Sequence, residues 1–283
     1  MSPSRRRHQR KIPEGILTVD FHSHTLHSDG TLTAAQLVAK FRARGVRWCS
    51  ITDHDTMRAY EGLESAGLRV VPGIEINTSW RGGDVHVLGY RLPLGPSPLE
   101  DVLERSRERR RARIDTIVAA LNAAGYPLTV EQVLAEGEGG HALGRPHVAK
   151  ALVRHRMIPS IAAAFRDLLS PGGPGYAPSY HLEPVEAVRL IRDAGGVAVL
   201  AHPGRVKDLT VLDDLVAAGL EGIEVFYPTH SAPEIADFRE RAKRYGLVMT
   251  GGSDFHDERW NTRGVGMDVE PEDLQPFLDR IAS

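Results

Sequence analysis

The chain has 283 residues, 41% of them hydrophobic and 25% charged, with a formal net charge of −2. This is the composition of a globular protein with a substantial core, and the balanced charge excludes a general attraction for polyanions or membrane surfaces. The single cysteine, Cys49, excludes a disulfide framework and a cysteine metal site, so we expect a cytoplasmic protein; no apolar run of about 20 residues predicts a membrane span.

The N-terminal segment, residues 1–14, is rich in basic residues and has no apolar stretch behind them. It therefore does not have the pattern of a signal peptide. We expect a disordered basic tail, with contact to nucleic acid as the alternative.

Short runs rich in β-branched residues recur along the rest of the chain. Between them lie segments with apolar residues at helical spacing, namely 33–45, 184–196 and 232–246. This alternation predicts parallel β/α units that form a covered sheet or a barrel. The predicted strands are 16–21, 47–52, 69–74, 84–90, 196–201, 221–226 and 246–251.

The alternation stops between the fourth and fifth predicted strands. The intervening stretch opens with the Pro-rich LPLGPSPLE, continues as a long charged helix and ends in the Gly/Pro-rich SPGGPGYAPSY. We interpret 98–182 as a helical insertion that divides one α/β unit into two parts, 15–97 and 183–283.

Coordinating side chains lie at or near the ends of the predicted strands. Parallel strand ends of a β/α barrel converge on one mouth, where active sites form. One histidine, His86, instead lies inside the fourth strand. The set comprises His22, His24, Asp29, His54, Glu75, His86, His202, Asp254 and His256.

Two pairs in this set have a spacing of two residues. The pairs His22/His24 and Asp254/His256 each place both side chains on one side of an extended segment. Buried ionisable groups are costly unless something compensates them, and metal cations do so by neutralising carboxylates and accepting imidazole lone pairs. We therefore interpret the set as a metal cluster rather than a coincidence of structural residues.

The ordered motifs HSHTLHSDG, ITDHDT, GIEIN, HVLGY, AHPGR, GIEVFYP and GSDFH resemble those of the polymerase-and-histidinol-phosphatase (PHP) family over about residues 18–257. The resemblance implies a metal-dependent phosphoesterase with a distorted seven-stranded (β/α)7 barrel. It also implies up to three divalent ions, which are Mn²⁺, Fe²⁺ or Zn²⁺ in this family.

The resemblance implies how the ligands are shared. One ion would be held by His22, His24, Glu75 and Asp254, a second by Glu75, His86 and His202, and a third by Asp29, His54 and His256. Asp20 and Asp53 adjoin ligands and are expected to orient imidazoles from behind. Asp55 is expected to cap a helix, and His27 is left outside the site.

Four residues are candidates for contact with substrate. Arg145 and His147 flank Pro146 at a predicted helix start, where N–H groups attract anions; the alternative is a simple capped helix. Arg205 is a candidate phosphate contact or the partner of a surface salt bridge. His230 is a candidate acid near the leaving group or an uninvolved loop residue.

The arginine-rich run 104–114 interleaves glutamates with arginines, which favours a solvated helix face over a nucleic-acid surface. The motif GRPH within the insertion resembles the family branch that acts on nucleotides. The leading hypothesis is therefore a phosphatase that removes the 3′-phosphate of small nucleoside 3′,5′-bisphosphates by metal-activated water. A 5′-to-3′ exoribonuclease acting on short RNA is the alternative. A histidinol phosphatase and a non-catalytic metal-binding accessory domain are disfavoured, and no obligate protein partner is evident.

Overall fold

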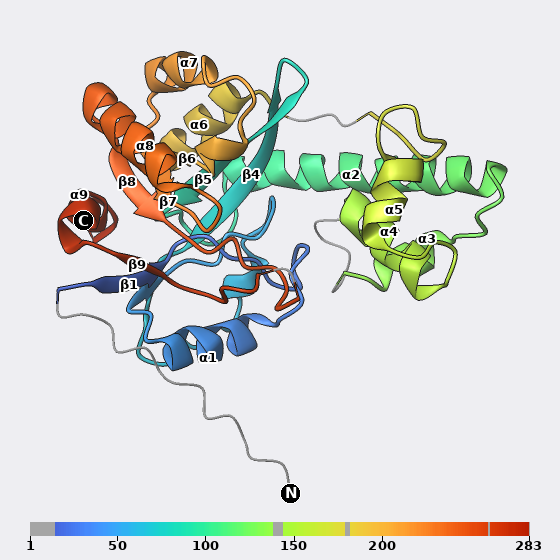
Figure 1. Cartoon of the computed structure of the whole chain (residues 1–283), viewed down its shortest axis with the longest axis horizontal. Coiled ribbons are helices and arrows are strands. Elements are labelled where there is room, and N and C mark those ends of the chain that lie inside the picture. Colours follow the sequence, from blue (N-terminus) through green and yellow to red (C-terminus); the bar gives the residue numbers. More distant parts are fainter. Residues whose placement is uncertain (1–14, 138–143, 179–181, 260, 283) are drawn as a thin grey trace, which may run out of the picture.

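The computed structural model describes residues 15–137, 144–178, 182–259 and 261–282, which build two β-sheets with helices outside them (Figure 1). The smaller sheet has the order β3-β2-β1-β9 and comprises β1 (Leu17–Asp20), β2 (Trp48–Cys49), β3 (Arg69–Val70) and β9 (Met267–Val269). The larger sheet has the order β4-β5-β6-β7-β8 and comprises β4 (Gly73–Trp80), β5 (Gly83–Tyr90), β6 (Val197–Leu200), β7 (Gly222–Phe226) and β8 (Val248–Gly251). The chain is thus an α/β protein, as predicted.

The two sheets meet through the segments that follow β1 and β2, which make a few backbone hydrogen bonds to the end of β8 and to β4. Isolated parallel bridges pair Ser23 with Phe255 and His54 with Glu75. Pairing is antiparallel for β1–β9, β4–β5 and β5–β6 and parallel for the other neighbours. The described strands therefore form two mixed or partly antiparallel sheets, and the predicted closed (β/α)7 barrel is not confirmed.

The strand predicted at 69–74 is in fact two strands. Pro72 lacks an N–H donor and interrupts the ladder between β3 and β4. The β4 strand then runs on to Trp80 and pairs with β5 as a hairpin, whose turn residues Arg81 and Gly82 both have positive φ. Consequently Glu75 lies within β4 and not at the end of a strand.

Helices cover the outer faces of both sheets (Figure 1). The predicted helices are present as α1 (Ala34–Arg44), α6 (Pro184–Asp193) and α8 (Ala232–Tyr245). A further helix, α7 (Val211–Ala218), lies beside the larger sheet together with α6 and α8. Thr33 caps α1 through a capping box, and Gly45 ends it with φ 82°. The C-terminal α9 (Pro271–Ala282) inserts Phe277 against Phe21 and Tyr90, so it closes the core beneath both sheets.

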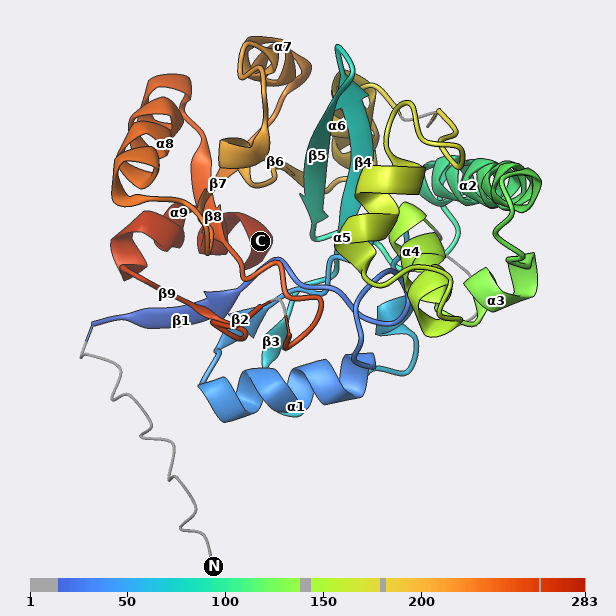
Figure 2. The same ribbon diagram turned by 45° about the vertical axis from the view of Figure 1, so that its right-hand side comes forward.

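The stretch between β5 and β6 is helical, as predicted. It contains α2 (Pro98–Ala123), α3 (Val130–Leu134), α4 (Arg145–Arg154), α5 (Ile161–Ala164) and the π-helical turn η3 (Phe165–Leu169). These helices pack around their own apolar cluster, which includes Ile117, Leu152 and Leu169. They lie to one side of the sheets in Figure 1, and Figure 2 shows the view down α2. None of the described helices is both long and apolar enough to cross a membrane.

Candidate metal centre

Short connections at the ends of the strands carry most of the coordinating residues. His22 and His24 follow β1 directly, and Asp254 follows β8. A side chain at Gly252 would meet the backbone nitrogen of His22 at 2.4 Å, so glycine is required for these two connections to approach so closely. The non-glycine residues His202 and Asp254 have φ 26° and 49°, which is backbone strain of the kind that accumulates at functional sites.

Glu75 lies at the centre of five imidazole rings. Its Oε1 is 2.8 Å from Nδ1 of His86 and 3.1 Å from Nε2 of His202. Its Oε2 is 3.2 Å from Nε2 of His22 and 3.1 Å from Nε2 of His24, and 3.2 Å from Nδ1 of His54. One fully buried carboxylate thus connects ligands from several elements.

Two further carboxylates complete the cluster. Asp254 Oδ1 is 3.1 Å from Nε2 of His24 and 3.5 Å from Nδ1 of His256. Asp29 Oδ1 is 3.2 Å from Nε2 of His256, and its Oδ2 is 3.9 Å from Nε2 of His54. All nine residues singled out from the sequence therefore come together.

Three groups of these side chains have ligand atoms within 4.8 Å of one another. They are His22/His24/Glu75/Asp254, His54/Glu75/His86 and His24/Asp29/His54/His256. The first group is the predicted one. In the second, His54 stands where His202 was expected, although His202 also contacts Glu75, and in the third His24 joins the predicted set.

Several atoms at the centre of the cluster have no hydrogen-bond partner among the described residues. They are Nε2 of His22 and His24, Nδ1 of His54 and Oδ1 of Asp29, all buried. Each of the three imidazole nitrogens lies within 4 Å of a Glu75 oxygen, and Asp29 Oδ1 lies within 4 Å of a His256 nitrogen, but none of these contacts has hydrogen-bonding geometry. Buried polar atoms are normally paired, so lone pairs aimed into a common space fit a shared cation. The residues present therefore suit divalent metal ions with nitrogen and oxygen ligands.

The charges of the cluster depend on one another. Burial would raise the pKa of Glu75, but His22, His54 and His86 hold that pKa well below its usual range. Burial would likewise lower the pKa of His24, but Asp254 and Glu75 raise it to about 10. Burial lowers the pKa of His54 to about 3 in spite of its carboxylate neighbours. Without an ion the neighbouring imidazoles favour the ionised form of these carboxylates, and a divalent cation would supply the same compensation while leaving the imidazoles neutral.

Glu224 is a residue of the site that the sequence reasoning missed. It lies inside β7, is fully buried, and accepts a hydrogen bond from Nδ1 of His22 at 3.0 Å. Its Oε2 also accepts the backbone N–H of His202 at 2.7 Å. The sequence feature that could have identified Glu224 is a single acidic residue inside the apolar strand GIEVF, because buried carboxylates are rare unless they are paired.

Asp20 and Asp53 support the site differently from the prediction. Asp20 accepts hydrogen bonds from the backbone N–H and the hydroxyl of Ser253 at 2.9 and 2.7 Å. Asp53 accepts from the Thr25 N–H at 2.7 Å and from the Ser28 hydroxyl at 2.6 Å. Neither carboxylate bonds an imidazole directly, so both fix the loops that carry the ligands.

Asp55 is not the helix cap that was expected. Its Oδ1 accepts the backbone N–H of Asn77 at 3.1 Å, and its Oδ2 lies 2.5 Å from Nη2 of Arg110. Arg107 is buried and donates to the Asp55 carbonyl at 2.7 Å. These two arginines of the run 104–114 bind the site from α2, so this part of the run is not a solvated face.

The motif GRPH begins α4, but His147 does not face a substrate. It is buried; its Nδ1 accepts the Gly144 N–H at 3.2 Å and its Nε2 donates to the Ser28 carbonyl at 2.8 Å. Both ring nitrogens are used within the protein, which favours the alternative of a simple capped helix over a phosphate contact by His147. Arg145 makes no ion pair with the described residues and stays a candidate.

The two remaining candidates for substrate contact, Arg205 and His230, lie in different surroundings. Arg205 donates to the Tyr227 hydroxyl at 2.9 Å and to Asp254 Oδ2 at 3.2 Å, and 61% of its side chain is exposed. It therefore stands beside the cluster with access to solvent. His230 instead donates to the Val225 carbonyl and accepts the Gly204 N–H, so both of its nitrogens are occupied, which favours the uninvolved loop residue over the acid.

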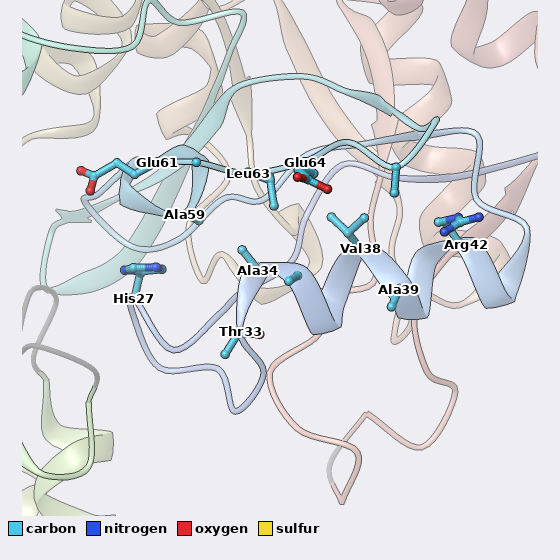
Figure 3. A pocket seen from close by; sticks show the side chains of 13 residues that line it. His27, Thr33, Ala34, Val38, Ala39, Arg42, Ala59, Glu61, Leu63 and Glu64 are labelled. Carbon is cyan, nitrogen blue, oxygen red and sulfur yellow. The ribbon is translucent and has the colours of Figure 1, made fainter.

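Two cavities are present among the described residues, one beside the cluster and one away from it. A cavity of about 350 Å³ is lined by the loops 227–231 and 261–264 and shares Tyr227 with the site. A second cavity of about 450 Å³ lies between α1 and residues 59–66, with His27 and Arg42 toward its two ends (Figure 3). His27 thus lies outside the cluster, as expected.

The cluster could hold divalent ions, and the comparisons with known proteins place this α/β chain in the class of metal-dependent phosphoesterases. The PHP domain model matches residues 20–158. The chain belongs to the PHP family, and the prediction of a phosphoric ester hydrolase is confirmed at the level of the enzyme class.

Three curated relatives cover most of the chain. The phosphoribosyl 1,2-cyclic phosphate 1,2-diphosphodiesterase of Eggerthella lenta is 37% identical over 88% of this chain and 98% of that relative. The 3′,5′-nucleoside bisphosphate phosphatase of Chromobacterium violaceum is 34% identical over 94% and 95%. The 5′-3′ exoribonuclease Rnm of Salmonella typhimurium is 34% identical over 84% of each. Their names agree on phosphate esters but differ in substrate.

A solved structure supports the same fold. It is described as an amidohydrolase from Chromobacterium violaceum with bound sulfate and no metal. Its TM-score against this chain is 0.83 at 30% identity, and the match covers 93% of this chain and 95% of that one.

Proposed function

We propose that the chain is a metal-dependent phosphatase that removes the 3′-phosphate from nucleoside 3′,5′-bisphosphates. The observation that carries the proposal is the cluster around Glu75, where buried atoms of His22, His24, His54 and Asp29 have no hydrogen-bond partner among the described residues. Two further supports are the nucleotide phosphatase relative, aligned over nearly the whole length of both chains, and a cytoplasmic setting inferred from cysteine usage.

The ligand residues would hold up to three divalent ions, and we retain Mn²⁺, Fe²⁺ and Zn²⁺ as candidates. Such ions activate water as the nucleophile and stabilise charge on the phosphate oxygens. The first ion would be bound by His22, His24, Glu75 and Asp254, with the remaining five ligands shared between the other two. Glu75, which contacts five of the imidazoles, would contribute to more than one of these ions.

The protein side chains would orient the ester. Arg205 is charged and partly exposed, and it reaches the cluster through Asp254 and Tyr227. A guanidinium there would bind phosphate oxygens and neutralise their charge. Tyr227 donates to Asp254 Oδ2 at 2.7 Å, which leaves Oδ1 turned toward the imidazoles. Arg145, at the start of α4, is a second candidate for a substrate phosphate.

Two other substrates follow from specific observations. A cyclic phosphodiester of a ribose phosphate is favoured by the relative from Eggerthella lenta. The exoribonuclease activity is favoured by the Salmonella typhimurium relative. A surface that binds a long RNA along the basic run 104–114 is disfavoured, because Arg107, Arg110 and Arg113 are already bound to protein groups.

The test is a panel of three substrates at equal concentration with manganese-loaded protein. Adenosine 3′,5′-bisphosphate, a ribose 1,2-cyclic phosphate and a 5′-phosphorylated RNA oligonucleotide are compared by kcat/KM, with chromatography of the products. The proposal predicts AMP and inorganic phosphate as the preferred reaction, with weak dependence on salt because one nucleotide makes few phosphate contacts. A higher kcat/KM for either other substrate contradicts it.

A further inference from the structure

We propose that the helices between β5 and β6 act as a positioning device for the third metal position, the one formed by Asp29, His54 and His256. The inference rests on the proposed function, because it concerns an ion that the function requires. It goes further by assigning a role to Lys150 and Arg110, two residues outside the ligand set.

The first contact comes from α4 and supports Asp29. Lys150 Nζ donates to the carbonyl of Asp29 at 2.9 Å, and His147 donates to the carbonyl of the preceding Ser28 at 2.8 Å. His147 and Lys150 are three residues apart and therefore lie on the same face of α4. Two successive carbonyls of the Ser28–Asp29 loop are thus fixed from behind by one helix face.

The second contact comes from α2 and supports His54. Arg110 binds the carboxylate of Asp55 at 2.5 Å, and Arg107 binds its carbonyl at 2.7 Å. Asp55 directly follows His54 and has φ 53°, a left-handed conformation that non-glycine residues adopt only where surrounding contacts impose it. The arginines of α2 are therefore among the contacts that hold this backbone in place.

The other ligands are supported from within the α/β part of the chain. His22 is bound by Glu224 of β7, and the loop of His24 is bound by Asp53. His256 is held by the side chain of Asn261, which accepts its backbone N–H at 2.8 Å. Asp29 and His54 differ from these ligands, because residues of α2 and α4 support both of them.

This division has a consequence for metal binding. Residues that orient metal ligands from behind typically change metal affinity by about 10- to 100-fold when they are removed. Loss of Lys150 is therefore expected to weaken the third position. Loss of Arg110 is expected to weaken the third position and also the second, because His54 belongs to both groups. The first position, built on His22, Glu75 and Asp254, keeps its own supports and its affinity.

The experiment titrates Mn²⁺ into metal-free full-length protein by isothermal titration calorimetry. The variants are Lys150→Met and Arg110→Met, with Lys243→Met and Arg105→Met as controls at exposed positions. We expect the Mn²⁺ sites that include Asp29 or His54 to weaken by about 10- to 100-fold in the test variants, while at least one class of sites, built on His22 and Asp254, is unchanged. The controls should match the unsubstituted protein, and Lys150→Arg, which keeps a charged donor, should restore binding.

The alternative outcomes are distinct. Unchanged affinity in all classes, or equal weakening of every class, overturns the inference, because the contacts would then be irrelevant or merely structural. If either methionine variant fails to fold in the metal-free state, Lys150→Gln and Arg110→Gln, which also remove the charge, replace it with the same expectation. Absence of Mn²⁺ binding by the unsubstituted protein contradicts the proposed function itself, and this inference with it.

Discussion

Nδ1 of His22 lies 3.0 Å from a carboxylate oxygen of Glu224, although 202 positions separate the two residues in the chain. A proton on Nδ1 shared with Glu224 leaves Nε2 as the lone pair that faces Glu75 and Asp254. The carboxylate thus fixes both the tautomer and the orientation of the ring. It also binds the N–H of His202, so one buried side chain joins two ligand-bearing loops.

The Glu224→Gln variant tests this relationship. The amide keeps the size of the carboxylate but loses its charge, so His22 is oriented less firmly. We expect Mn²⁺ affinity to fall by about 10- to 100-fold, measured by calorimetric titration of metal-free protein. Glu221→Gln, which changes an acid just before the same strand, is the matched control and should bind as the unsubstituted chain does. Equal affinity in the two variants would show that Glu224 does not act on the metal site.

Arg205 provides a separate test, directed at substrate binding. Removal of its guanidinium in Arg205→Met should raise KM at saturating Mn²⁺, a condition that is needed because Arg205 also contacts the ligand candidate Asp254. A charged hydrogen bond contributes about 1.5–3 kcal/mol, which corresponds to roughly 10- to 150-fold in KM. Lys207→Met, two residues further at an exposed position, is the control. An unchanged KM would remove Arg205 from the substrate site.

His230 is expected to be structural, because backbone groups occupy both of its ring nitrogens. The His230→Asn variant should lose about 1–3 kcal/mol of unfolding free energy through unpaired backbone groups, measured by urea denaturation. The alkaline limb of its pH–rate profile should stay where it is in the unsubstituted enzyme. Loss of that limb would restore His230 as the general acid.

The sequence predicted which nine side chains come together, because each follows, or lies within, a recognisable β segment. Local pattern also located α1, α6 and α8 by their apolar spacing and terminal glycines. Other features depended on contacts between distant segments. In the sequence, Glu224 is only an acidic residue within an apolar strand, and nothing nearby indicates its partners His22 and His202. The partners of His147 and His230 are backbone groups, which residue spacing does not predict. The division at Pro72 was missed because a short apolar run does not distinguish one strand from two.

Cys49 is expected to be chemically inert. It is fully buried in the core between α1 and the smaller sheet, and burial, with the charge of Asp20, raises the pKa of its thiol to about 12. Because the thiolate is the reactive form, native protein at pH 8 should not react with an aromatic disulfide reagent within the time in which urea-unfolded protein reacts completely. Rapid labelling of the native chain would contradict the packing described for this region.

The most direct test of the account measures bound manganese and phosphate release on the same samples. Protein stripped with a chelator, and then reconstituted with increasing Mn²⁺, is incubated with adenosine 3′,5′-bisphosphate, alongside an Asp254→Asn variant. The account predicts no phosphate release without metal, recovery in proportion to bound Mn²⁺, and loss of both metal and activity in Asp254→Asn. Full activity after metal removal, or in a variant that binds no metal, would contradict the assignment of the Glu75 cluster as the catalytic centre.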